Sequence, residues 1–102
     1  MLHIKTAAEF KKEVLDEKTT SVLVDFYADW CGPCKMLAPV VEQFSKDNPK
    51  VKVVKVDVDS AQELAQQYGV MSIPTVYVFK QGKPTKQMIG YQDQKTLEDA
   101  TR

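Results

Sequence analysis

The sequence predicts one α/β domain with a central mixed β-sheet, mostly parallel, flanked by helices on both faces. Three observations carry this prediction. Strand-like apolar runs alternate with helix patterns, one of the candidate strands is apolar on both sides, and a hairpin follows the last alternation. The 102 residues suit a single domain, residues 1–102, and leave no room for a second.

In the N-terminal half, residues 2–4 are a candidate short strand, and Thr6 with Glu9 forms a capping box that opens a first helix. Residues 21–28 are apolar on both sides, which is typical of a central strand. A helix should begin at the cysteines, kink at Pro39 and end near residue 47. Its inner face has apolar residues at spacings of three and four: Leu37, Val40, Val41 and Phe44.

The next segment repeats the alternation. Residues 51–58 are rich in β-branched side chains and predict a second buried strand. Ser60 and Glu63 form a candidate capping box for a short helix. Gly69 stands where a glycine commonly ends a helix.

The C-terminal part predicts a hairpin and a last helix. Residues 75–79 read as a third long strand, and the turn 80–83 leads to a partner at 85–89. Asp93 is placed to cap a final helix that contains Leu97.

Composition narrows the function classes. Lys plus Arg and Asp plus Glu both number 14, so the net charge is zero, and no basic excess favours nucleic acid or an anionic membrane. The N-terminus lacks the apolar core of a secretory signal, so we expect a cytoplasmic protein that neither enters a membrane nor binds nucleic acid. In a reducing cytosol, a close cysteine pair indicates catalysis or metal binding.

Cys31 and Cys34 carry the most informative pattern. They lie three residues apart at the start of a predicted helix, so both sulfurs share one face. The helix N-terminus stabilises a thiolate, Gly32 lets a substrate backbone approach, and Pro33 suits the first helical position. We predict one accessible sulfur, Cys31, that attacks, and one tucked into the helix, Cys34, that resolves.

Two other uses of the pair are less favoured. A structural disulfide here would close a tiny loop and stabilise little. A zinc site needs about four ligands, and His3 is the only obvious further candidate, so we expect no metal.

The run Val-Asp-Phe-Tyr-Ala-Asp-Trp-Cys-Gly-Pro-Cys-Lys, residues 24–35, and the later Ile73-Pro74-Thr75 resemble the thioredoxin family. A close cysteine pair beside a strand–helix–strand pattern is itself a recognised mark of thioredoxin-like proteins. The resemblance covers essentially the whole chain. It implies the thioredoxin fold and a monomeric, general protein-disulfide reductase. It also implies re-reduction by a flavin- and NADPH-dependent thioredoxin reductase, and the chain has no nucleotide fingerprint of its own, so we expect no bound cofactor.

Asp25 stands in the middle of an apolar strand. Burial of a carboxyl there should raise its pKa. One interpretation is a buried ion pair with Lys55 on the neighbouring strand. The resemblance implies another, in which Asp25 is the buried proton acceptor for Cys34, acting through water with help from Lys55. The two roles can coexist.

The resemblance also implies a substrate-binding surface around Cys31. Pro74 should follow a cis peptide bond, and the backbone of Ile73 should pair with an extended substrate chain. The other members of this surface would be Trp30, Val58, Ile89, Gly90 and Tyr91. Ordinary core or scattered surface positions remain the alternative, especially for Val58 and Ile89.

Three rival functions are open to a chain with such a cysteine pair. An oxidase or isomerase outside the cytosol would be expected to carry a charge between the cysteines, and a glutaredoxin-like enzyme would have other intervening residues. A redox-independent binding module would use the apolar surface alone. The chain also departs from the common family pattern at Tyr27, where many relatives have tryptophan, and at Met71-Ser72, where a basic residue is frequent.

Overall fold

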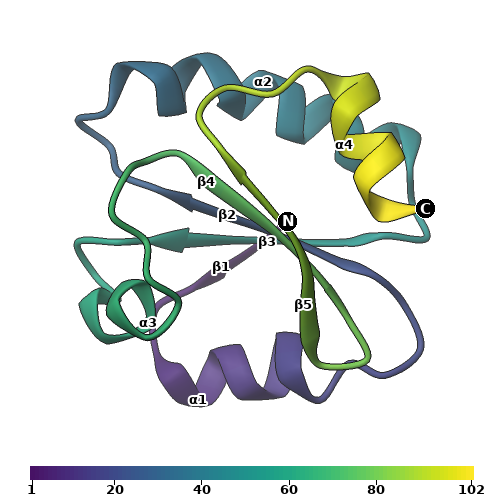
Figure 1. The fold of residues 1–102 in the computed structure, drawn as a ribbon, viewed down its shortest axis with the longest axis horizontal. Coiled ribbons are helices and arrows are strands. Elements are labelled where there is room, and N and C mark those ends of the chain that lie inside the picture. The colour runs from purple at the N-terminus through teal and green to yellow at the C-terminus, as the bar shows by residue number, and fades with distance from the viewer.

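The computed structural model describes residues 1–102 and contains one five-stranded sheet, in the order β1-β3-β2-β4-β5 (Figure 1). Helices cover both of its faces. The strands are β1 (Leu2–Ile4), β2 (Val22–Tyr27), β3 (Lys52–Asp57), β4 (Thr75–Lys80) and β5 (Lys83–Ile89). The helices are α1 (Ala7–Phe10), which continues as the π-helix η1 (Lys11–Leu15), α2 (Gly32–Asp47), α3 (Gln62–Gln67) and α4 (Gln94–Thr101).

The sheet is mixed, as the sequence predicts. β1 and β2 both run parallel to β3, whereas β4 lies antiparallel to β2 and β5 antiparallel to β4. Parallel pairings are therefore two of the four, and the expectation of a mostly parallel sheet is wrong. The reason is that β4 enters the sheet beside β2 in the reverse direction and its hairpin partner adds a second antiparallel pair.

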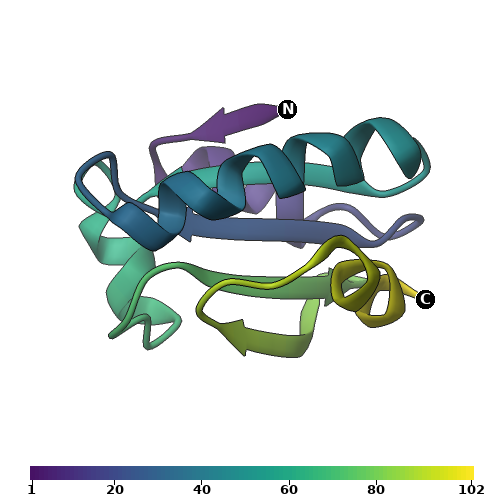
Figure 2. The ribbon, with the colours of Figure 1, turned by 90° about the horizontal axis from the view of Figure 1, so that it is seen from above.

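Two apolar cores lie on opposite faces of the sheet. The helices α1 and α3 cover one face and α2 and α4 the other, which Figures 1 and 2 show from two directions. The first core joins Phe10, Val14 and Leu64 to alternate residues of β2 and β3, such as Val24 and Val54. The second core joins the inner face of α2 and Leu97 of α4 to the other face of the sheet. Its members are Leu23, Leu37, Val41, Phe44, Val53, Val76, Val78 and Leu97.

This alternation fixes the surroundings of Asp25. Successive side chains of a strand point to opposite faces, so Asp25 shares the face of Leu23, beneath α2. Lys55 is the register partner of Asp25 on β3 and points to the same face. The helix α2 therefore covers a sheet face that is apolar at one end and carries charges at the other.

Most of the predicted helix ends are confirmed. The Thr6–Glu9 capping box is present, Asp93 accepts the backbone N–H of Thr96, and Gly69 follows α3 with a φ of +64°. The Ser60 capping box is wrong, because α3 begins one residue later, after Ala61, without a side-chain cap. A backbone turn takes its place, in which the N–H groups of Ser60 and Ala61 both donate to the Asp57 carbonyl.

The long helix α2 continues through Pro39 to Asp47. No helix in the structure combines the length and the apolar character needed to cross a membrane.

Candidate active site

The cysteine pair lies at the junction of β2 and α2, where Cys31 occupies the N-cap position of the helix. Its sulfur accepts the backbone N–H of Cys34 at 3.2 Å, the contact that a serine or aspartate makes at other helix starts. The sequence predicted that Pro33 would be the first helical residue. Because Cys31 is the N-cap and the helix begins at Gly32, Pro33 is the second. Its missing N–H is still one of the four that lack an intrahelical acceptor.

Cys31 and Cys34 form a disulfide, with their Cα atoms 5.2 Å apart. The expectation of one accessible and one tucked sulfur is not met in this oxidised form, since both residues are only 4% exposed. The helix start and the loop before β4 cover both. The two cysteines differ in their neighbours: Cys31 Sγ lies 3.7 Å from the carbonyl oxygen of Ile73, whereas Cys34 lines a hollow with Tyr27 and Lys55.

Asp25 lies in the interior of the protein with a carboxylate oxygen, Oδ1, that has no hydrogen-bond partner among the protein groups. Burial removes the carboxylate from water and raises the pKa of Asp25 to about 6, while the Lys55 charge partly opposes the rise. A group that titrates near neutral pH can hold or release a proton under ordinary conditions.

Lys55 does not form the predicted ion pair with Asp25. The ion pairs of the structure involve other residues, and the Lys55 ammonium lies 4.5 Å from the ring centroid of Tyr27. Tyr27 is two residues after Asp25 on β2 and therefore points to the same face. The sequence singled out Tyr27 only as a departure from the family pattern, and nothing in the chain order signalled its contact with Lys55.

A small surface hollow of about 140 Å³ opens beside Cys34. Tyr27 and Lys55 line it together with residues of the α2 start. One water molecule takes up about 30 Å³ in the liquid. The hollow is therefore large enough to give solvent a route to Cys34 and its charged neighbours.

The segment before β4 closes the other side of the disulfide. The Ile73–Pro74 peptide bond is cis, the isomer that the resemblance implies. Thr75, which is 1% exposed, donates its hydroxyl to the Ser72 carbonyl at 2.5 Å and so ties this segment to the start of the strand. The Pro74 carbonyl in turn accepts the N–H of Gly90, whose φ of +89° suits glycine.

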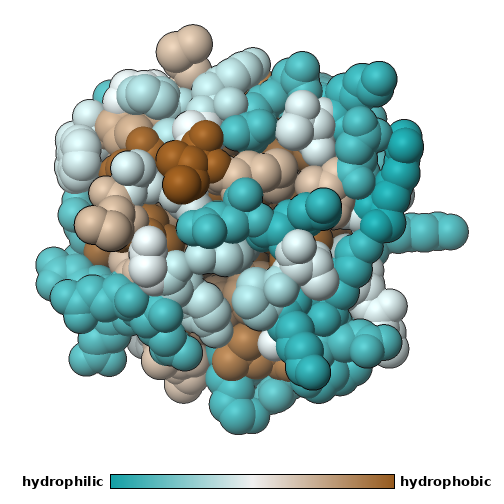
Figure 3. Space-filling view, viewed as in Figure 1, coloured by the Kyte–Doolittle hydropathy of each residue, from teal (hydrophilic) through white to brown (hydrophobic).

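The predicted apolar surface is partly present as exposed side chains. Trp30 is 69% exposed, and Ile89 and Tyr91 are also exposed, whereas Val58 and Ile73 are half-buried and contact the cysteine cluster. Val58 also packs against the first core, so its alternative role as a core residue is present too. In Figure 3, apolar atoms gather mainly in the upper-left part of one face, and hydrophilic side chains cover its right-hand side.

Sequence reasoning missed two contributors to this end of the molecule. Met36 on α2 is a large apolar residue that is exposed. Its position, one residue before the inner-face Leu37, could have indicated from the sequence that it lies off the buried face of the helix. Asp59 accepts the indole N–H of Trp30 at 2.8 Å and fixes that ring, a contact that no sequence pattern indicated.

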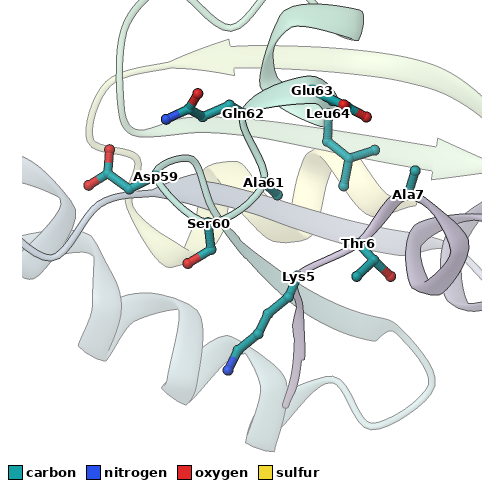
Figure 4. A pocket seen from close by; sticks show the side chains of 9 residues that line it. All are labelled: Lys5, Thr6, Ala7, Asp59, Ser60, Ala61, Gln62, Glu63 and Leu64. Atoms are coloured by element: carbon teal, nitrogen blue, oxygen red, sulfur yellow. The ribbon is translucent and has the colours of Figure 1, made fainter.

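The largest surface hollow lies away from the disulfide. It measures about 400 Å³ and lies between the start of α1 and the β3–α3 connection, lined mostly by polar side chains (Figure 4). Lys5, Ser60 and Glu63 are typical of its walls, and neither cysteine lines it. The largest hollow is therefore separate from the cysteine pair.

The comparisons with known proteins decide the family. The thioredoxin family model matches residues 1–102. The chain belongs to the thioredoxin family. It is 50% identical to a thioredoxin of Alicyclobacillus acidocaldarius over 94 residues, which is 91% of this chain and 88% of the relative. A thioredoxin of Rickettsia felis is 47% identical over 95 residues, 92% of this chain and 90% of the relative.

Solved structures of the family have the same fold. The X-ray structure of Fasciola hepatica thioredoxin superimposes with a TM-score of 0.92 at 40% identity, over all of this chain and 98% of that one. The thioredoxin fold is thus confirmed. Family membership together with the Cys31–Cys34 disulfide makes this thioredoxin-family chain a dithiol–disulfide oxidoreductase that acts on protein disulfides and depends on a reductase for its own reduction.

Proposed function

We propose that the chain is a general protein-disulfide reductase in which Cys31 attacks the substrate and Cys34 resolves the mixed disulfide. The observation that carries this assignment is the position of Cys31 as the N-cap of α2, with its sulfur accepting the Cys34 N–H. In the reduced protein, this N–H and the positive end of the 16-residue helix favour a thiolate on Cys31.

The cycle transfers two electrons to the substrate. The Cys31 thiolate attacks one sulfur of the substrate disulfide, which forms a mixed disulfide and releases the other substrate sulfur as a thiolate. The Cys34 thiolate then attacks Cys31 Sγ, which forms the Cys31–Cys34 bond and releases the second substrate thiolate. Each of the two substrate thiolates takes up a proton. The Cys31–Cys34 dithiol has lost two protons and two electrons in forming its disulfide.

Asp25 takes the proton of Cys34 in the second step. Its pKa of about 6 leaves it mostly ionised near pH 7, so it can accept a proton, and the hollow beside Cys34 has room for water to relay it. Lys55 assists by moderating the proton affinity of Asp25. Gly32 and Pro33 keep the helix start open to an incoming backbone, since both are exposed.

The substrate lies across the segment that precedes β4. The Ile73 carbonyl stands beside Cys31 Sγ, so an extended substrate chain can pair with the backbone there, next to cis-Pro74 and Gly90. Trp30, Val58 and Tyr91 provide apolar contacts around that chain. This surface suits unfolded or loop-borne disulfides and not a deep-bound small molecule.

Electrons reach the chain from outside. The proposed donor is NADPH, acting through a thioredoxin reductase that reduces the Cys31–Cys34 bond. We further propose that the chain works as a cytoplasmic monomer without a bound cofactor.

Trapping with a cysteine variant tests the assignment of roles. Cys34→Ser should accumulate a stable mixed disulfide with a peptide disulfide through Cys31, because the resolving sulfur is absent. Cys31→Ser should form none and should lose reductase turnover. A Cys31→Ser variant that traps the peptide through Cys34 at the same rate would reverse the two roles, and a protein whose partners bind both variants equally would act as a binding module.

A further inference from the structure

Lys55 lies beside Asp25 in the sheet register but does not form an ion pair with it. Asp25 and Lys55 are register partners on adjacent strands and share one sheet face, and a buried carboxylate oxygen of Asp25 has no hydrogen-bond partner among the protein groups. A buried carboxylate is ordinarily paired with a cation or hydrogen-bonded, and Lys55 is the lysine whose register position would allow such a pair. Instead, Lys55 Nζ lies over the ring of Tyr27, 4.5 Å from its centroid.

We propose that Tyr27 is a positioning residue for the resolving step: its ring holds the Lys55 ammonium away from the Asp25 carboxyl and leaves that group free to exchange a proton with Cys34. The inference rests on the function proposed above, and it adds a residue that acts through Lys55.

The charged groups around the ring agree with this role. Asp57 is the register partner of Tyr27, but its carboxylate accepts the N–H of Asp59 at 2.9 Å. Burial raises the pKa of Tyr27, and the carboxylates of Asp57, Asp29 and Asp25 raise it further, so the phenol stays neutral. The Lys55 ammonium therefore meets an uncharged ring face and not a phenolate.

The other elements packed around Asp25 add little charge. On β4 its register partner is the apolar Val76. Cys34 and Lys35 of α2 border the hollow that Tyr27, Asp29 and Lys55 also line, and Lys35 is exposed to solvent. Lys55 is consequently the cation whose position matters most for Asp25.

The ring sets a balance between two positions of Lys55. When Asp25 is protonated, nothing draws the ammonium from the ring face. When Asp25 ionises, its charge attracts Lys55, and the contact with Tyr27 has to be given up. The ring thereby raises the proton affinity of Asp25.

The test is a titration of the Asp25 carboxyl carbon by NMR in the oxidised protein, where the cysteines do not titrate. Tyr27→Leu should lower the pKa of Asp25 by about half a unit, the shift that corresponds to an exposed cation–π contact. Tyr27→Phe keeps the ring and should keep the wild-type value. If Tyr27→Leu does not fold, Tyr27→Met fills similar space without a ring and should give the same downward shift.

Variants of two lysines distinguish an effect that acts through Lys55 from a general change in the burial of Asp25. In a Lys55→Gln background, Tyr27→Leu should no longer move the pKa of Asp25. Lys52→Gln is the matched control, because Lys52 is on the same strand but pairs with Glu13 at 2.8 Å; it should leave the Tyr27→Leu shift intact. The Lys55 ε-methylene protons should show ring-current shifts in wild type and Tyr27→Phe only.

Three results would overturn the proposal: an unchanged or raised Asp25 pKa in Tyr27→Leu, an equal fall without Lys55, or no ring-current shift in the wild-type protein. The titration uses oxidised protein and does not depend on turnover. Failure of the proposed Asp25 role would be seen separately, as wild-type resolution of the mixed disulfide in Asp25→Ala.

Discussion

Two polar residues are buried equally deeply in this protein and have opposite surroundings. Asp25 in the middle of β2 and Thr75 at the start of β4 are each 1% exposed. The Thr75 hydroxyl donates to the Ser72 carbonyl, whereas Asp25 Oδ1 has no hydrogen-bond partner in the protein. A buried polar group that is satisfied stabilises the fold, and one that is not satisfied costs stability. The comparison indicates that Thr75 stabilises the fold, whereas Asp25 costs stability, as a group kept for the proposed proton transfer would.

The largest expected effect comes from removing the unsatisfied group. Asp25→Ala should raise the free energy of unfolding at pH 8 by up to about 3 kcal/mol, since the raised pKa of about 6 measures the cost of ionising the buried carboxyl. The same variant should slow resolution of the mixed disulfide by roughly 100-fold, the usual contribution of a general base. Urea unfolding and stopped-flow thiol release would measure the two effects.

Asp25→Asn is the control for shape, because it removes the charge and keeps the volume. It should change both quantities in the same direction. An Asp25→Ala protein that is less stable than wild type at pH 8 would contradict the comparison, because Asp25 would then contribute stability as Thr75 does.

The same free energy should be visible in the pH dependence of stability. The folded chain keeps the Asp25 proton up to a pKa of about 6, whereas an unfolded aspartate loses it near 3.8, so the folded state binds more protons between these values. The Asp25 contribution to the free energy of unfolding therefore falls as the pH rises through this window. Above pH 6, where Asp25 is ionised in both states, burial of its charge lowers the free energy of unfolding by the full amount.

Exposed carboxylates act in the opposite direction, because hydrogen bonds lower the pKa of Glu9, Asp47 and Asp93. Their contribution grows as the pH rises through the acid range. These contributions are the same in wild type and Asp25→Ala, so they cancel when the free energies of unfolding of the two proteins are subtracted. A difference that stays constant from pH 4 to pH 8 would show that burial does not shift Asp25.

Removing the satisfied hydroxyl should have a smaller effect of the opposite sign. Thr75→Val keeps the side-chain shape and loses the bond to Ser72, so we expect a fall of about 1 kcal/mol in the free energy of unfolding. Thr85→Val is the matched control, because Thr85 donates to the Val78 carbonyl from an exposed strand. Thr85→Val should lower the free energy of unfolding by less than Thr75→Val does. Equal losses in urea unfolding would show that burial of the hydroxyl does not determine its contribution.

An exposed polar contact should give the smallest effect. Trp30→Phe deletes the indole N–H that donates to Asp59, but the side chain is 69% exposed, and water can replace the partner. The free energy of unfolding should change by no more than about 0.5 kcal/mol. A loss of 1 kcal/mol or more would place this surface bond on a level with the buried hydroxyl of Thr75.

Much of the fold was predictable because its signals are local. The capping box at Thr6, the cap at Asp93, the strand at residues 21–28 with its two apolar sides and the glycine after α3 each depend on neighbours within a few residues. The Ser60 cap failed because a backbone turn from Asp57 took over the hydrogen bonds that the side chain would have made. The direction of β4 also lay outside local reach, since it depends on which strand β4 joins.

The sequence by itself determined the chemistry of this chain. The spacing of Cys31 and Cys34 at a helix start specifies a dithiol pair, and a carboxyl at position 25 in an apolar strand specifies a raised pKa, because both follow from covalent order and local periodicity. Tertiary structure alone decided what surrounds these groups. It placed the Ile73 carbonyl against Cys31 Sγ, left Asp25 without an ion pair and put Lys55 over Tyr27. These contacts join segments whose approach is set by packing of the whole sheet, and side-chain electrostatics at close range depends on positions that no local pattern encodes.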